Sequence, residues 1–137
     1  MKKSVTVFPE IQQRIVVDCI IGVPDLDDTN QDSKSVICKA LIDTGAMRTC
    51  ISSRIANYLE MIPTGTMRIT AANEHTDIVN THIVNITLGG EIRFNMIKVP
   101  RISMTGEDLI IGMDLLSQGN IVITNDTYTG TVFMFER

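Results

Sequence analysis

The segment Ala40-Leu41-Ile42-Asp43-Thr44-Gly45-Ala46 places an acidic side chain where an apolar run meets a glycine-containing turn. The run over residues 35–42 is rich in apolar and β-branched side chains and predicts a strand. A carboxylate at its end would be held by a rigid element at the edge of a core. Thr44 adds a hydroxyl group, and Gly45 permits close approach of the backbone. The segment is therefore either a reactive carboxylate or an ordinary Asx turn that closes a strand.

Working outward from this segment, the sequence predicts short elements on both sides. The strand-like Thr49-Cys50-Ile51 is followed by a short helix that Ser52 or Ser53 can cap. Far downstream, Leu109-Ile110-Ile111 predicts a brief buried strand, and residues 113–118 predict a second short helix. Gly119 is placed as the residue that ends this helix.

The remaining sequence alternates between apolar and polar residues and predicts mostly strands. The expected strands cover residues 14–23, 35–42, 66–70, 77–79, 82–88, 92–99, 109–111, 121–123 and 131–135. Residues 24–35 predict an inserted surface loop, residues 66–79 a hairpin with a polar tip, and residues 121–135 a terminal hairpin. We see no internal repeat or domain boundary. The expectation is one all-β, barrel-like domain over residues 1–137 with one or two short helices.

The composition excludes several classes of function. Apolar residues make up 44% of the chain and charged residues 20%, which is typical of a globular domain. A formal net charge of -4 argues against a broad nucleic-acid-binding face, which would be basic. Because no apolar run has the length of a membrane span or a signal peptide, we expect no membrane partner and a cytoplasmic location.

The cysteines and histidines show no metal-binding pattern. Cys19, Cys38 and Cys50 are odd in number and form no CxxC pair, which is typical of reduced thiols in a cytosol. His75 and His82 lie far from any cysteine pair, so a zinc site is not expected. The acidic residues of the 24–35 loop lack the spacing of a calcium-binding EF-hand. We therefore expect no metal and no cofactor.

Two blocks taken together resemble the retropepsin family of aspartic proteases. Asp43-Thr44-Gly45-Ala46 after an apolar strand resembles the active-site segment of that family, and Ile111-Gly112 resembles its downstream apolar-apolar-glycine segment. The blocks occur in the family's order, and the resemblance covers roughly residues 11 to 123. It implies a closed barrel of the acid-protease fold that works as a homodimer.

The resemblance also implies roles for the residues of these blocks. The chain has a single Asp-Thr-Gly triplet, so Asp43 would face Asp43 of a second copy, and the two carboxylates would share one proton. Thr44 would bond the opposite chain across the two-fold axis. Gly45 would approach the substrate backbone, Ala46 would line the cleft, and Gly112 would pack under the catalytic turn.

The resemblance further implies that the hairpin over residues 66–79 is a flap that closes on an extended peptide substrate. The expected substrate-contacting residues at its tip are Ala71, Ala72, Asn73, Glu74 and His75. Viral flaps are rich in glycine at this point, whereas this tip is not. Either the hairpin register differs from the prediction, or the flap is stiffer and more polar.

Two further expectations concern ion pairing and dimerisation. Viral retropepsins pair an acidic residue after the catalytic triplet with an arginine after the downstream glycine. Here Arg48 and Asp114 could form an equivalent pair with the charges exchanged, or they could be unrelated surface charges. The terminal hairpin could supply the dimer interface with Phe133 and Phe135 as anchors, or it could simply pack into the core of one chain.

Three functions remain open from the sequence. The first is a homodimeric aspartic endopeptidase that uses the Asp43 dyad, and the second is a catalytically silent module of the same fold that binds peptides or mediates dimerisation. The third is an unrelated β-barrel interaction domain in which the Asp43 triplet is only a turn.

Overall fold

A computed structural model describes residues 1–71 and 73–137. These residues form ten strands and two short helices. In chain order the elements are β1 (Lys3–Phe8), β2 (Val16–Pro24), β3 (Asp32–Ile42), β4 (Cys50–Ser52), α1 (Ser53–Tyr58), β5 (Gly65–Thr70), β6 (Thr76–Leu88), β7 (Ile92–Ile102), β8 (Leu109–Ile111), α2 (Met113–Leu116), β9 (Asn120–Asp126) and β10 (Gly130–Glu136). Neither helix has the length and apolar character needed to cross a membrane.

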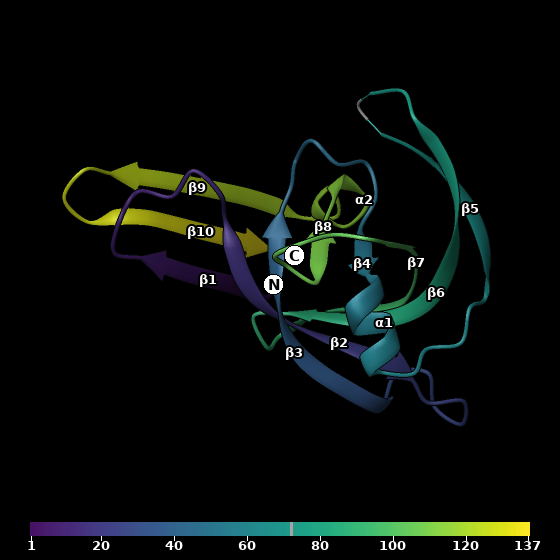
Figure 1. Cartoon of the computed structure of the whole chain (residues 1–137). Helices are drawn as coiled ribbons and strands as arrows, with labels where there is room; N and C mark the ends of the chain where they lie inside the picture. Colours follow the sequence, from purple (N-terminus) through teal and green to yellow (C-terminus); the bar gives the residue numbers. More distant parts are fainter. Residues whose placement is uncertain (72) are drawn as a thin grey trace.

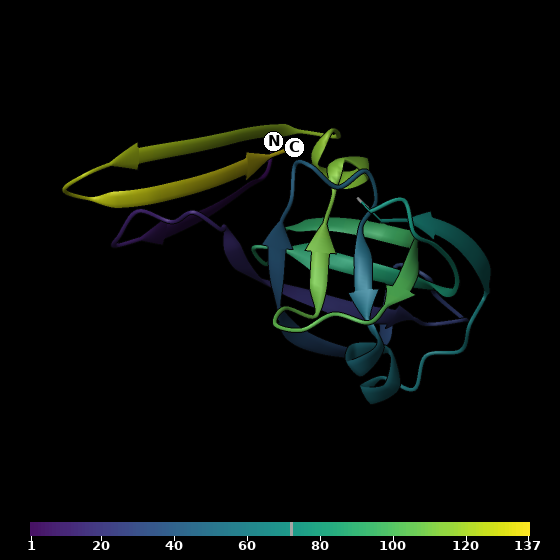
Figure 2. The same cartoon turned by 45° about the horizontal axis from the view of Figure 1, so that its top comes forward.

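Six strands close into a barrel. They are hydrogen-bonded in the order β2-β3-β8-β4-β7-β6, and β2 also pairs with β6, from Cys19↔Leu88 to Gly22↔Asn85. Strand β5 extends the sheet beyond β6. Both views show this ring with the β5–β6 hairpin curving away from it (Figures 1 and 2). The predicted all-β closed barrel with short helices is confirmed.

The barrel interior is built from aliphatic side chains, as the scarcity of aromatic residues requires. Burial of each such side chain contributes about 1.5–3 kcal/mol relative to exposure. The fully buried aliphatic side chains include Ile21, Ile51, Val84, Ile86, Val99, Leu109 and Ile111.

Strand β8 lies between two strands that are near one another in sequence. It pairs in parallel with β3 (Ala40↔Leu109 to Ile42↔Ile111) and antiparallel with β4 (Cys50↔Ile110). Strand β4 in turn pairs in parallel with β7. The segment 43–49 that joins β3 to β4 must therefore pass over the end of β8.

The chain ends form a second sheet of three strands in the order β1-β10-β9. Figures 1 and 2 show this sheet extending to one side of the barrel. The sequence predicted the β9–β10 hairpin but not β1. Phe133 and Phe135 are fully buried within the chain, and the Phe135 ring centroid lies 6.2 Å from that of Phe94. The expectation that these two side chains anchor a dimer interface is therefore wrong, because they pack into the core of one chain.

Three predicted boundaries also require correction. The inserted loop covers residues 25–31 rather than 24–35, because Asp32 already belongs to β3. Residues 77–79 and 82–88 lie in one strand, β6, whose register with β7 shifts between Val84 and Ile86. Helix α2 ends at Leu116, and Gly119 has no left-handed backbone; a side chain there would collide with β10.

Candidate active site

Asp43 lies on a turn that several main-chain hydrogen bonds hold in place. Its N–H donates to the Ile111 carbonyl of β8 (3.0 Å), and its own carbonyl accepts from the Ala46 N–H (3.2 Å). The Gly45 N–H donates to Asp43 Oδ1 (2.9 Å). This bond is the Asx-type contact that the sequence allowed. It also fixes the orientation of a half-exposed carboxylate at the end of a barrel strand.

Gly112 supports this turn from below. A Cβ at this position would lie 2.8 Å from Ala46 O and from both the carbonyl carbon and oxygen of Arg48. The adjacent Met113 N–H donates to the Ala46 carbonyl (2.8 Å). Only a residue without a side chain permits this approach, so the expected packing of Gly112 under the Asp43 turn agrees with the geometry.

A buried threonine and a carboxylate close the far side of the turn. Thr49 is fully buried, and its N–H donates to both carboxylate oxygens of Asp114 (3.0 Å each). Its hydroxyl donates to Asp114 Oδ1 (2.8 Å) and accepts from the Gly112 N–H (3.1 Å). The sequence does not predict this pair, because the two residues are distant in sequence and each resembles an ordinary capping or surface residue.

The predicted Arg48–Asp114 ion pair is not formed among the described residues of the chain. The Asp114 carboxylate is occupied by Thr49 and by the Leu115 N–H (3.0 Å), and the described residues form no ion pair between Asp114 and Arg48, which is exposed. Of the two alternatives, the ion pair is absent from the described residues of the chain, and Asp114 binds Thr49 instead.

The outer edge of the turn is open to solvent. Thr44 and Gly45 are exposed, while Ala46 is half-buried. Within the described ranges, the Thr44 hydroxyl makes no hydrogen bond to its own chain. A single chain thus presents the oriented Asp43 carboxylate beside a Thr44 hydroxyl that has no hydrogen bond to its own chain. The resemblance implies two such pairs, one from each copy of a dimer.

The predicted hairpin exists, with its tip at the expected residues. Strands β5 and β6 pair up to Thr70↔Thr76. The Ala71 N–H donates to the His75 carbonyl (2.9 Å), and Asn73 Oδ1 accepts from the His75 N–H (3.0 Å). Ala72 lies outside the described residues. In Figures 1 and 2 the tip lies at the same end of the barrel as the turn after β3.

The backbone of this tip explains how the hairpin turns without glycine. Glu74 adopts a left-handed conformation with φ of 66°, and its N–H donates to the Ala71 carbonyl (2.9 Å). His75 Nε2 lies 3.1 Å from Asp77 Oδ1 on the same hairpin. The predicted hairpin register therefore agrees with the structure, whereas the stiffness of the tip and its role as a flap stay predictions.

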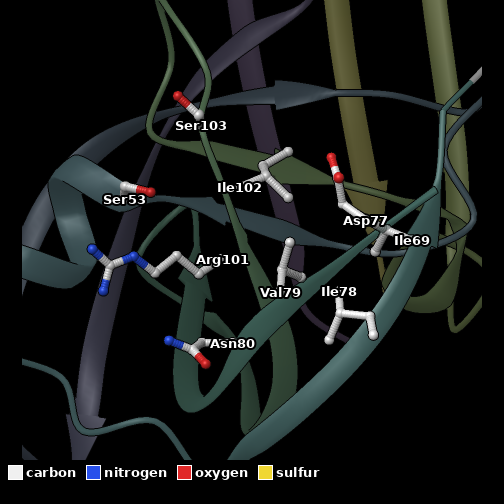
Figure 3. A pocket seen from close by; sticks show the side chains of 9 residues that line it. All are labelled: Ser53, Ile69, Asp77, Ile78, Val79, Asn80, Arg101, Ile102 and Ser103. Carbon is white, nitrogen blue, oxygen red and sulfur yellow. The ribbon is translucent and has the colours of Figure 1, made fainter. Parts of the chain in front are cut away.

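A groove of about 550 Å³ separates the hairpin from the barrel wall. Figure 3 shows its mixed lining: Ser53, Ile69, Asp77, Ile78, Val79, Asn80, Arg101, Ile102 and Ser103. Arg101 also donates to Asn57 Oδ1 of α1 (2.7 Å). None of the turn residues 43–46 lines this groove.

The three thiols are poor candidates for a nucleophile. Burial, with a smaller effect of the Asp108 charge, raises the pKa of Cys38 to about 12. Burial, followed by the Asp114 charge, raises the pKa of Cys50 to about 11, and the pKa of Cys19 rises further still. A thiol is reactive as the thiolate, so these cysteines are unreactive near neutral pH.

Comparisons with known proteins identify the class. A family described as gag-polyprotein putative aspartyl protease matches residues 33–118, which include both the Asp43 turn and Gly112. The chain belongs to this family of retropepsin-like aspartyl proteases. None of the curated proteins compared with the chain matches it.

Two solved structures are similar to the chain, and the first supports this assignment at the level of the fold. A retropepsin-like aspartic protease from Rickettsia conorii has a TM-score of 0.58 and 15% identity, over 98% of this chain and 98% of that chain. The retroviral protease-like domain of Ddi1 from Leishmania major has a TM-score of 0.48 and 22% identity, over 80% of this chain and 79% of that one. The Rickettsia structure, with its TM-score of 0.58, confirms the predicted retropepsin-like fold.

Proposed function

We propose that this protein is an aspartic endopeptidase whose active site forms when two copies pair and each contributes Asp43. The observation that carries the proposal is the turn itself. A half-exposed carboxylate is fixed by the Gly45 N–H, on a turn packed against Gly112 and bonded to β8. Such rigidity is what a catalytic carboxylate needs, because a displacement of about 1 Å can lower a rate by about two orders of magnitude.

The chemistry requires two carboxylates in different protonation states. Two like charges at hydrogen-bond distance cannot both ionise at low cost, so the pair shares one proton. The ionised carboxylate removes a proton from a water molecule, whose oxygen attacks the peptide carbonyl carbon. The neutral carboxyl group donates its proton to the carbonyl oxygen, which gives a tetrahedral diol. Proton transfer to the amide nitrogen then breaks the C–N bond and releases an amine and a carboxylic acid.

The same proposal gives roles to the neighbouring groups. The exposed Thr44 hydroxyl would bond to the partner chain and keep the two turns coplanar. The β5–β6 hairpin, with tip residues Ala71, Ala72, Asn73, Glu74 and His75, would close over an extended peptide and exclude water. The three free thiols are consistent with a reducing compartment such as the cytoplasm.

The direct test is cleavage of an unfolded protein mixture between acidic and neutral pH. We expect cutting by the wild type, inhibition by a statine-type transition-state analogue, and no cutting by Asp43→Asn. Asp18→Asn is a matched control, because Asp18 is an exposed carboxylate on β2 that forms a surface ion pair with Lys39. An equal loss of activity in Asp43→Asn and Asp18→Asn would contradict a catalytic role for Asp43.

A mixing experiment tests whether the site is shared. When wild type and Asp43→Asn are refolded together in equal amounts, random pairing leaves about a quarter of the dimers with both carboxylates. Specific activity should then fall to about a quarter of the wild-type value. A fall to one half would mean that each chain works alone.

A catalytically silent peptide-binding module remains the second candidate, and the polar hairpin tip is the observation that favours it. Glu74 and His75 occupy a position that is glycine-rich in viral flaps. Closure of this hairpin over a substrate can therefore differ from the closure of viral flaps. Binding of the transition-state analogue by a folded dimer that cuts no substrate would establish this second function.

A further inference from the structure

A second groove lies at the end of the barrel away from the Asp43 turn. It measures about 690 Å³ and is formed by the end of β2, the 25–31 loop, the segment after α1, and parts of β6 and β7. Figures 1 and 2 place α1 and the β2–β3 loop at the end of the barrel opposite the turn after β3. Among the described residues, none of 43–46, 71 and 73–75 lines this groove.

One wall of this groove is held by a buried amide. Asn85 is almost fully buried, and its Nδ2 donates to the Thr29 carbonyl (3.1 Å) and to Asp32 Oδ1 (2.9 Å). Its Oδ1 accepts from the Met96 N–H (2.9 Å), and Asp32 also pairs with Arg93 (2.8 Å). The 25–31 loop is thus tied to β6 and β7, so the groove is formed before any ligand arrives.

The rim of this groove exposes large aliphatic side chains. Leu26 on the loop is 97% exposed, and Ile62 after α1 is 82% exposed. Met61 and Met96 contribute flexible side chains to the same lining. Apolar side chains exposed around a concave surface mark binding sites, and methionine adapts to varied partners.

The charges around this groove are mainly negative. Asp25, Asp27 and Glu60 line it together with a single cation, Lys34. Lys34 Nζ already donates to the Leu59 carbonyl (2.8 Å) and lies 3.6 Å from Glu60. Asp25 and Asp27 form no ion pair with any described residue. Two carboxylates beside an apolar groove therefore lack a cationic partner.

His82 adds a buried polar group to the lining. Its Nδ1 lies 3.2 Å from the Ile62 carbonyl and must donate to it, because a carbonyl only accepts. Its Nε2 is then an acceptor, and it is buried without a partner among the described residues. The hydrogen bond from Nδ1 ties strand β6 to the segment after α1, so two of the elements that form the groove are held together.

We propose that this groove binds a peptide segment in which a large aliphatic side chain is adjacent to lysine or arginine. The aliphatic side chain would pack between Leu26 and Ile62, and the basic side chain would pair with Asp25 or Asp27. The groove would then dock such a segment of a protein partner, independently of the Asp43 turn. This role goes beyond the proposed function and does not depend on it.

Binding can be measured without cleavage on full-length, 15N-labelled protein carrying Asp43→Asn. The probe is an acetylated tetrapeptide amide of sequence lysine-leucine-leucine-lysine, followed by backbone NMR shifts. Two matched peptides replace both lysines by glutamate or both leucines by serine. We expect shifts concentrated in residues 23–34, 60–64, 82–83 and 96, and at least tenfold weaker binding of either matched peptide.

Variants of the protein complete the test. Leu26→Ser with Ile62→Ser should weaken binding at least tenfold, while Ile37→Ser should leave it unchanged, because Ile37 is 71% exposed on β3 outside the groove. All three side chains are exposed, so the melting temperatures should match that of the parent. Asp25→Asn with Asp27→Asn should weaken binding several-fold at low salt, and less at high salt.

Four results would overturn the proposal. The first is equal binding of the glutamate peptide, and the second is unchanged binding after the Leu26 and Ile62 substitutions. The third is shifts confined to the groove beneath the β5–β6 hairpin. The fourth is association with vesicles of anionic phospholipid but not with the lysine peptide, which would assign the exposed aliphatic side chains to a membrane surface.

Discussion

Replacing Gly112 with alanine should destabilise the protein through one steric contact. Gly112 has φ of −98°, a conformation that alanine adopts without strain, so the backbone itself adds no penalty. The added methyl group would lie 2.8 Å from three backbone atoms of Ala46 and Arg48. Backbone atoms cannot move aside as a side chain can. Since overpacking a tight site costs about 1–3 kcal/mol, we expect a loss of about 2–3 kcal/mol.

Urea denaturation gives the free energy of unfolding directly, and thermal melting should show the same change. For a chain of this size each 1 kcal/mol corresponds to roughly 3–5 °C, so Gly112→Ala should melt about 6–15 °C lower. Because the displaced atoms belong to the Asp43 turn, activity measured well below the melting temperature should also fall.

Gly65→Ala is the matched control for this prediction. An added Cβ at Gly65 would have only the Thr81 hydroxyl near it, at 3.4 Å, which is an ordinary contact distance. This variant should stay within about 0.5 kcal/mol of the wild type. A Gly112→Ala protein as stable as Gly65→Ala would refute the argument that the glycine is required for close packing beneath the turn.

Two other variants test contacts described above. Asp114→Ala should lower the free energy of unfolding in urea by about 2–4 kcal/mol, because the buried Thr49 N–H and hydroxyl lose their charged acceptor. Arg48→Gln should lower it by almost nothing. Equal losses in the two variants would indicate an Arg48–Asp114 ion pair after all. Burial lowers the pKa of His82, so the folded state disfavours the protonated ring. The unfolded state takes up that proton near pH 6.5, so stability should fall as pH drops below this value, by at most about 1.4 kcal/mol per pH unit from this group. His82→Gln should fall less steeply than the wild type in urea midpoints measured from pH 7.5 to 5, and parallel curves would contradict this.

Local patterns in the sequence predicted the parts of the fold that depend on neighbouring residues. The β5–β6, β6–β7 and β9–β10 hairpins follow from alternating residues on either side of short polar or glycine turns. The sequence offered Ser52 or Ser53 as a helix cap, and it is the Ser52 hydroxyl that accepts from the Ile55 N–H (3.0 Å). The sequence linked the Asp43 turn to Gly112 because the segments around them together resemble the retropepsin family. Neither segment alone predicts that the two lie side by side.

The misses share a different cause, which is dependence on distant residues. Strand β1 exposes Val5 and Val7 and is defined by pairing with β10 at the other end of the chain. Strand β3 begins at Asp32 because Asn85 and Arg93 hold that carboxylate. Asp114 is likewise paired with Thr49 across the sequence. A polar residue has no local periodicity that identifies its partner, so such contacts become visible only in the folded chain.

The placement of β8 between β3 and β4 sets an order for folding. Strands β3 and β4 have no hydrogen bonds to one another in this sheet order and meet only through residues 109–111. The turn over residues 43–49 therefore cannot take its final shape until the chain has been synthesised beyond Gly112. During synthesis the Asp43 carboxylate is made early but gains its supporting contacts late, so a nascent chain remains without a formed turn until most of its residues have left the ribosome.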